Sequence, residues 1–186
     1  GDFFTMKGVI EEFLYKAGMK LKPEYDPEAG KPFLHPGRQA NVVYDGTVIG
    51  YLGEVHPTVA ANYAIKERVY VAVLDMPEIV SRASFDHKYE GIAKFPAAAR
   101  DISMVVPKKV LAGDIEKIFD EKGGQFLEKY DLFDIYEGAQ IEKGFKSMAY
   151  SLVFRAHDKT LGENEISAAM KKIMNGLNGL GIELRS

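Results

Sequence analysis

The second half of the chain carries six runs of hydrophobic positions whose spacing changes from strand-like to helical and back. Alternating or β-rich runs predict strands, and apolar residues three and four positions apart predict helices. In chain order the runs lie at residues 102–106, 113–122, 127–136, 146–155, 161 to about 177, and 182–185. This order predicts a βαββαβ sandwich of the α+β class, in which two helices cover one face of a four-stranded antiparallel sheet.

Alternation along each strand predicts which side chains lie under the helices and which face outward. In the third strand the large residues take the inner positions, at Met148, Tyr150, Leu152 and Phe154. The same rule places Phe133 and Ile135 inside. It directs outward Ser103, Val105, Leu132, Asp134, Tyr136, Ser147, Ala149, Ser151, Val153, Arg155 and Arg185.

The last helix has the clearest boundaries in the second half. Thr160 followed by Glu163 matches a capping box, in which each side chain accepts a hydrogen bond from a backbone N–H of the first turn. Lys171 and Lys172 point away from the apolar face of this helix. That face is formed by Ile166, Ala169, Met170, Ile173, Met174 and Leu177.

The first half mixes helix and strand. The predicted elements are a helix at 3–17, strands at 40–44 and 47–55, a short helix from Pro57 to about Ile65, and a strand at 69–74. Asp45-Gly46 joins the first two strands and accepts the positive φ angles of a tight hairpin turn. A polar segment at 84–93 predicts the connection between a domain at 1–88 and a domain at 94–186.

Composition narrows the class of protein without indicating a partner. The chain has 24 basic and 27 acidic residues, a net charge of −3, and the residues from Lys94 onward are balanced. The strong basicity of many nucleic-acid-binding proteins is therefore missing. The absence of cysteine excludes disulfides and fits a reducing compartment, so we expect the cytoplasm. No apolar run reaches the roughly 18 residues of a membrane helix, and the first residues do not resemble a secretory signal.

No set of residues has the spacing of a catalytic or metal site. His35, Glu54 and His56 could ligate a metal, but the histidines lie 21 positions apart and lack the helical spacing of HExxH. His-Pro turns that set loop geometry are the favoured role. No serine stands in a GxSxG elbow. We expect neither catalytic nor metal-ligating residues in this chain.

The open side of the predicted sheet suits single-stranded RNA, because bases stack on exposed aromatic rings while Arg and Lys contact phosphates. Tyr136 is the candidate stacking residue. Arg100 could clamp a phosphate or pair with a carboxylate, and Lys146 with Arg155 would give a local positive edge. The alternative is that this side of the sheet simply meets water or a neighbouring domain.

Short segments in a fixed order resemble one known family. In the second half they are Lys94–Asp101, Phe133–Gly138, Lys146–Ala149, Thr160–Ile166 and Leu184–Arg185. In the first half they are Asp2–Gly8, Leu34–Ala40 and Ile49–Pro57, with Gln39 where Ser is more usual. Together they resemble the C-terminal part of the beta subunit of bacterial phenylalanyl-tRNA synthetase, which ends in a ferredoxin-fold anticodon-binding domain.

The resemblance implies a division of roles along the chain. Residues 1–88 would be the C-terminal part of a catalytically silent, class II synthetase-like core, and residues 94–186 a ferredoxin-like anticodon-binding domain. The implied partners are tRNA(Phe) and the alpha subunit of an alpha2 beta2 heterotetramer. ATP and magnesium are implied for phenylalanylation by the alpha subunit, with no cofactor and no catalysis in this chain alone. The candidate RNA-binding residues are Lys94, Arg100, Ser103, Tyr136, Lys146, Ser147, Ser151, Arg155 and Arg185.

Two rival functions remain open, because the βαββαβ arrangement hosts many unrelated activities. A small-molecule regulatory module would bind an amino acid or a nucleotide without RNA. A hydrolase of the acylphosphatase type would need a phosphate-cradling loop with Arg after the first strand, and the segment Pro107–Leu111 contains no Arg.

Overall fold

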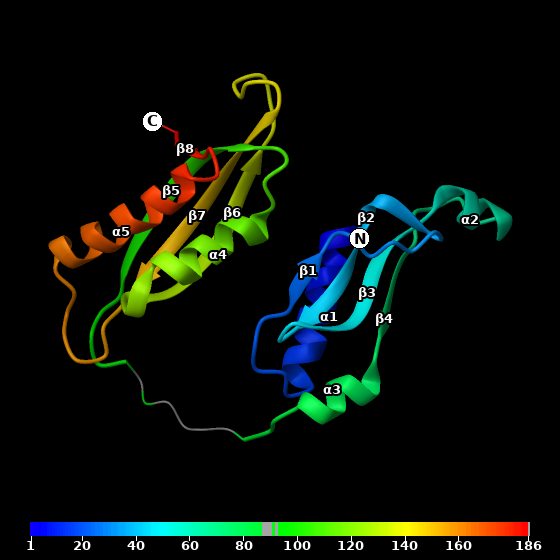
Figure 1. The fold of residues 1–186 in the computed structure, drawn as a ribbon, viewed down its shortest axis with the longest axis horizontal. Coiled ribbons are helices and arrows are strands. Elements are labelled where there is room, and N and C mark those ends of the chain that lie inside the picture. The colour runs from blue at the N-terminus through cyan, green and yellow to red at the C-terminus, as the bar shows by residue number, and fades with distance from the viewer. Residues whose placement is uncertain (87–90, 92, 186) are drawn as a thin grey trace. The chain divides into compact units, whose positions relative to one another are not determined.

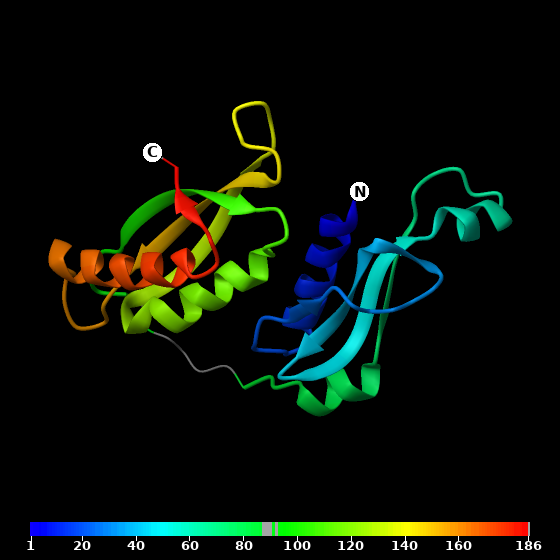
Figure 2. The same ribbon diagram turned by 45° about the horizontal axis from the view of Figure 1, so that its top comes forward.

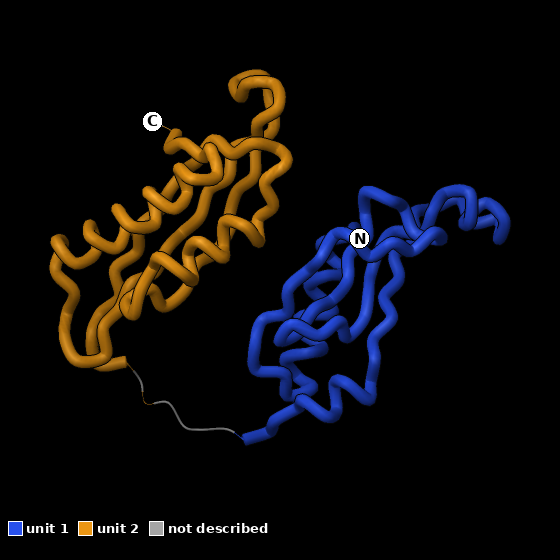
Figure 3. The backbone as a smooth tube through the Cα atoms, in the orientation of Figure 1, with its two compact units in different colours: residues 1–89 blue, residues 90–186 orange. Residues whose placement is uncertain are grey.

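The computed structural model describes residues 1–86, 91 and 93–185, which belong to two compact units at 1–89 and 90–186 (Figure 3). Each unit has its own four-stranded sheet and its own hydrophobic core. The predicted connection at 84–93 lies partly outside the described residues. Within the described ranges, no helix combines the length and apolar character that crossing a membrane requires.

Unit 1 combines an antiparallel sheet of order β1-β2-β3-β4 with three helices (Figure 1). The helix α1 contributes Ile10 and Leu14 to the core of this unit. The predicted hairpin turn between β2 and β3 is confirmed, since Asp45 and Gly46 have φ angles of 47° and 71°. The elements are α1 (Phe3–Lys16), β1 (Glu24–Asp26), β2 (Leu34–Tyr44), β3 (Thr47–Val55), α2 (Pro57–Asn62), β4 (Tyr70–Leu74) and α3 (Met76–Arg82).

Unit 2 has the predicted βαββαβ order, with an antiparallel sheet of strand order β6-β7-β5-β8. Figures 1 and 2 show α4 and α5 side by side on one face of this sheet. The turn between β6 and β7 extends beyond the neighbouring strands in both views. The elements are β5 (Ala98–Pro107), α4 (Ala112–Lys122), the 3-10 helix η1 (Gly124–Phe126), β6 (Leu127–Tyr136), β7 (Phe145–Phe154), α5 (Glu163–Asn178) and β8 (Glu183–Leu184).

The core of unit 2 forms where β7 meets the helices. The large residues of β7 are at most 1% exposed, as the alternation predicts, and they are Met148, Tyr150, Leu152 and Phe154. Phe119 of α4 packs edge-on against Tyr150, with ring centroids 5.0 Å apart. The predicted apolar face of α5 lies in the same cluster, through Ile166, Ile173 and Leu177. Each such side chain stabilises the fold by about 1.5–3 kcal/mol relative to exposure.

The predicted capping box of the last helix is wrong. The helix α5 begins at Glu163, its N-cap is Gly162, and Glu165 accepts a hydrogen bond from the Gly162 N–H at 3.1 Å. Leu161 packs against the core, and the N-cap Gly162 has an extended backbone, with a φ of −83° and a ψ of 158°. Glu163 is consequently free to pair with Arg100.

Two tyrosines in the core of unit 2 differ in how their hydroxyl groups are satisfied. Tyr130 donates a hydrogen bond to Asp120 at 3.0 Å, whereas the buried hydroxyl of Tyr150 has no hydrogen-bond partner among the described residues. Burial is the main reason why the pKa of each phenol is raised, so both hydroxyls stay protonated at neutral pH.

We expect Tyr150→Phe to leave the free energy of unfolding unchanged or to raise it by up to about 1 kcal/mol, because it removes a buried hydroxyl without a partner. Tyr130→Phe, the matched control, loses a hydrogen bond and should lower the free energy by about 1 kcal/mol. Urea unfolding followed by circular dichroism measures both. A loss of more than about 1 kcal/mol in Tyr150→Phe would contradict this account.

Candidate nucleic-acid interface

The face of the unit 2 sheet opposite α4 and α5, which we call the open face, contains four of the nine candidate binding residues. Cross-strand pairs place their two side chains on the same side of a sheet. The pairs Ser103–Ala149, Val105–Ser147 and Tyr136–Ser147 therefore lie together on this face. The open face is formed by Ala99, Asp101, Ser103 and Val105 of β5, Ser147, Ala149, Ser151 and Val153 of β7, Lys129, Asp131, Asp134 and Tyr136 of β6, and Glu183 of β8.

A β-bulge in β6 interrupts the alternation of side chains along this strand. Leu132 pairs with Tyr150, but the next residue of β7, Ala149, pairs with Asp134, so Phe133 is the extra residue of the bulge. Leu132 packs against the core, and Phe133 is 59% exposed. The predicted outward orientation of Leu132 and the predicted burial of Phe133 are therefore wrong, because strict alternation does not allow for a bulge.

Beyond the bulge, alternation resumes and Tyr136 lies on the open face, as predicted. Tyr136 is 39% exposed, and its ring lies against Gly138. Any larger residue at position 138 would place its Cβ atom on the phenol oxygen of Tyr136. Ile135, between the two aromatic residues, pairs with the core residue Met148 and faces the helix side. The sequence reasoning missed Phe133 and Gly138, although a glycine two positions beyond a candidate aromatic residue is a signal for close backbone approach.

The three serines among the candidate residues are all on the open face but differ in access. Ser147 is only 4% exposed, whereas Ser103 and Ser151 are half-buried. The carbonyl of Ser103 accepts a hydrogen bond from the Arg185 N–H at 2.8 Å, which holds Arg185 at the edge of the sheet. The Arg185 guanidinium donates to Gln140 at 3.3 Å.

Carboxylates offset the cations of the open face, which corrects the expected positive edge. Lys129 pairs with Asp131 at 3.1 Å, and Arg155, which follows β7, pairs with Glu128 at 2.9 Å. The face also carries exposed carboxylates at Asp101, Asp134 and Glu183. Among the described residues, Arg185 is the cation at this face that has no carboxylate partner.

Two candidate cations lie away from the open face. Arg100 pairs with Leu152 on the helix side and forms an ion pair with Glu163 in the first turn of α5, so of its two expected roles the structure shows the carboxylate pair. Lys146 donates to the Val110 carbonyl at 2.9 Å, and burial lowers the pKa of this lysine. Lys94 is exposed and precedes β5.

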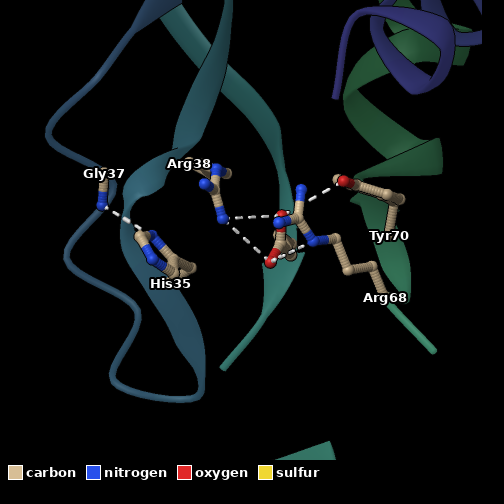
Figure 4. Close-up of polar contacts among 6 residues, drawn as sticks. His35, Gly37, Arg38, Arg68 and Tyr70 are labelled. Carbon is tan, nitrogen blue, oxygen red and sulfur yellow. Dashed lines mark hydrogen bonds and ion pairs between the residues drawn. The ribbon is translucent and has the colours of Figure 1, made fainter. Parts of the chain in front are cut away.

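The residues weighed as a metal site in unit 1 have other partners (Figure 4). Glu54 is 3% exposed, and both of its oxygens lie 3.1 Å from the Arg38 Nη1. Tyr70 donates to Glu54 Oε2 at 3.1 Å. The Nδ1 atoms of His35 and His56 accept hydrogen bonds from nearby backbone N–H groups, at 3.1 and 3.2 Å. No group of three or more potential metal ligands is found within the described ranges.

Two family models match the chain. Residues 93–185 match the ferredoxin-fold anticodon binding domain, and residues 1–76 match the phenylalanyl tRNA synthetase beta chain CLM domain. The first match covers unit 2 from just before β5 to Arg185, and therefore the whole of the open face.

Curated relatives are similar over nearly the full chain. The phenylalanine–tRNA ligase beta subunit of Clostridium acetobutylicum is 40% identical over 185 residues, which cover 99% of this chain and 23% of the relative. The subunit of Bacillus subtilis is 38% identical, with 95% of this chain and 22% of the relative covered. The chain therefore spans less than a quarter of the length of these relatives. A structure of Arabidopsis thaliana MSL1 is 12% identical and covers 98% of this chain and 64% of its own, but its TM-score of 0.33 is too low to indicate a shared fold.

Proposed function

Because this chain belongs to the family of phenylalanine–tRNA ligase beta subunits, we propose that its unit 2 binds the anticodon region of tRNA(Phe) through the open face. The observation that carries this proposal is the exposed aromatic ring of Tyr136 on the open face, with a second exposed ring three positions earlier, in the bulge of the same strand. Phe133 and Tyr136 are 59% and 39% exposed, and Arg185 lies at the edge of the same sheet. Unpaired bases stack on such rings, while a guanidinium can contact a phosphate.

The charges of the open face favour contacts with base edges over contacts with the RNA backbone. Carboxylates accept hydrogen bonds from base N–H groups but repel phosphates. Asp134 is exposed and lies two positions from Tyr136, so a base stacked on the ring would present its edge near a fixed acceptor. Ser103 and Ser151 add hydroxyl groups that both donate and accept. This arrangement supports sequence reading with a small electrostatic contribution.

In the whole enzyme, we propose that this contact orients the tRNA. Holding the anticodon arm fixes where the acceptor end enters the alpha subunit, which converts part of the encounter into a positioned reaction. Residues 1–88 would complete the catalytically silent core of the beta subunit, in an alpha2 beta2 enzyme of the cytoplasm. The role of this chain in phenylalanylation is therefore binding, and the chemistry takes place in the alpha subunit.

We propose that ATP and magnesium serve that chemistry outside this chain. Magnesium prefers several carboxylate or carbonyl oxygens around one point. The buried carboxylate of Glu54 is taken by Arg38 and Tyr70, and no three potential ligands converge elsewhere in the described ranges. We place both cofactors in the alpha subunit.

The stacking role is tested by removing each ring. We expect Phe133→Ala and Tyr136→Ala each to weaken binding of a fluorescent tRNA(Phe) anticodon stem-loop by about 5-fold to 100-fold, because each stacked base contributes about 1–3 kcal/mol. Fluorescence anisotropy at low salt gives the dissociation constants, with a stem-loop of permuted loop sequence measured in parallel.

Ile135→Ala is the matched control, because Ile135 is 52% exposed and lies between the two rings but faces the helix side. Its affinity for the stem-loop should equal that of the unchanged chain. If Phe133→Ala, Tyr136→Ala and Ile135→Ala all bind the stem-loop as tightly as the unchanged chain does, the open face is not the stacking surface. If the unchanged chain does not prefer the tRNA(Phe) loop, sequence reading does not reside in this chain.

The dependence of the RNA affinity on salt concentration measures the number of phosphates that the chain contacts. Binding to single-stranded RNA changes with salt by a log–log slope of about −0.7 per neutralised phosphate. At the open face Arg185 can contact a phosphate directly and Arg155 can do so after leaving Glu128, so we expect a slope no steeper than about −2. A slope steeper than about −4 would show that a basic surface other than the open face dominates binding.

A further inference from the structure

The arrangement around Glu54 in unit 1 holds more positive charge than its carboxylate neutralises. Figure 4 shows Arg38, Arg68 and Tyr70 close together, and each of them has an atom within 4.0 Å of the Glu54 carboxylate. Arg38 uses one nitrogen, Nη1, to reach both oxygens, and Tyr70 satisfies Oε2 as well. Two guanidinium groups and one carboxylate leave a net charge of one positive unit at this point.

Arg68 contributes little to the stability of the buried carboxylate. Its Nε lies 4.0 Å from Glu54 Oε1, which is beyond hydrogen-bond distance, and its side chain is 68% exposed. Exposed ion pairs of this kind contribute about 0–1 kcal/mol. Within the described ranges Arg68 has no other polar partner, and the Arg38 side chain is 41% exposed. Both groups therefore keep N–H donors available to a ligand.

We propose that Arg38 and Arg68 form a binding site for one carboxylate group of a partner polypeptide, with Glu54 as the residue that positions them. A guanidinium presents its N–H donors as a planar fork that matches the two oxygens of a carboxylate. Glu54 holds the guanidinium group of Arg38 in position, because this carboxylate is 3% exposed and both of its oxygens accept hydrogen bonds from Arg38. Such pre-organisation lowers the entropy lost when a ligand binds.

The surroundings favour a polypeptide over a nucleic acid. The segments that lead into the site expose apolar side chains, with Phe33 at 39%, Tyr63 at 75% and Ile65 at 41%. Aromatic residues and Arg are the types enriched at protein interfaces. A nucleic acid would instead require a row of cations along its backbone, whereas the residues before Lys94 carry the whole net charge of −3. This site lies in unit 1 and is independent of the RNA contact proposed for unit 2.

The site can be tested with small probes that present each oxyanion alone. The arginine Nε–H resonances of the isotopically labelled chain would be followed by NMR at constant ionic strength. One titration uses N-acetylglutamate amide, which carries a side-chain carboxylate, and the other uses dimethyl phosphate, which mimics the nucleic-acid backbone. We expect a saturable shift of the Arg38 and Arg68 resonances with the carboxylate probe, and weaker binding of the phosphodiester.

Arg68→Gln should weaken the binding of the carboxylate probe, read from Arg38, about tenfold, because it removes charge-assisted hydrogen bonds. Arg68→Lys keeps the positive charge but loses the planar fork of N–H donors. Its affinity for the carboxylate probe should lie between that of Arg68→Gln and that of the unchanged chain. Lys66→Gln is the control, because it removes one positive charge two positions away from Arg68. Its affinity for the carboxylate probe should stay within about twofold of that of the unchanged chain. The proposal is overturned if the carboxylate gives no saturable shift, if Arg68→Gln binds as the unchanged chain does, or if dimethyl phosphate binds more tightly.

Discussion

The burial of β7 beneath α4 and α5 is the constraint on which the candidate interface depends. Its four large side chains are at most 1% exposed, and β7 is hydrogen-bonded to β5 on one side and β6 on the other. A slip of one residue would bring these side chains to the open face, so the packing fixes the register of all three strands. The positions of Ser103, Ser151 and Tyr136 follow from that register and not from any contact among themselves.

The sequence was sufficient for the parts of unit 2 that rest on periodicity. Strand alternation in β7 and helical spacing in α5 predicted the buried faces, because each buried residue there follows its neighbours at a constant interval. The sequence was not sufficient where one residue interrupts the regular spacing of buried positions. The extra residue Phe133 and the displaced cap at Gly162 depend on how Leu132 and Leu161 pack, which local spacing does not encode. The partner of Arg100 is 63 positions away and is set by tertiary structure.

The two candidate sites use charge in opposite ways. At the open face Lys129 and Arg155 are paired with carboxylates, so the RNA contact that we propose relies on exposed aromatic rings more than on charge. At Glu54 a buried carboxylate holds two guanidinium groups together and leaves an excess of one charge. The first arrangement suits ligands recognised by shape and hydrogen bonding, and the second suits a single anionic group.

The bulge in β6 also makes the number of residues in this strand a functional quantity. Between the buried Leu132 and the exposed Tyr136, the chain must contain one residue more than regular pairing with β7 requires. Deletion of the extra residue would restore regular pairing with Tyr136 still opposite Ser147, so Phe133 would be lost while Tyr136 kept its place on the open face. The length of this segment therefore decides whether the strand carries one or two exposed aromatic rings, and it leaves the face of Tyr136 unchanged.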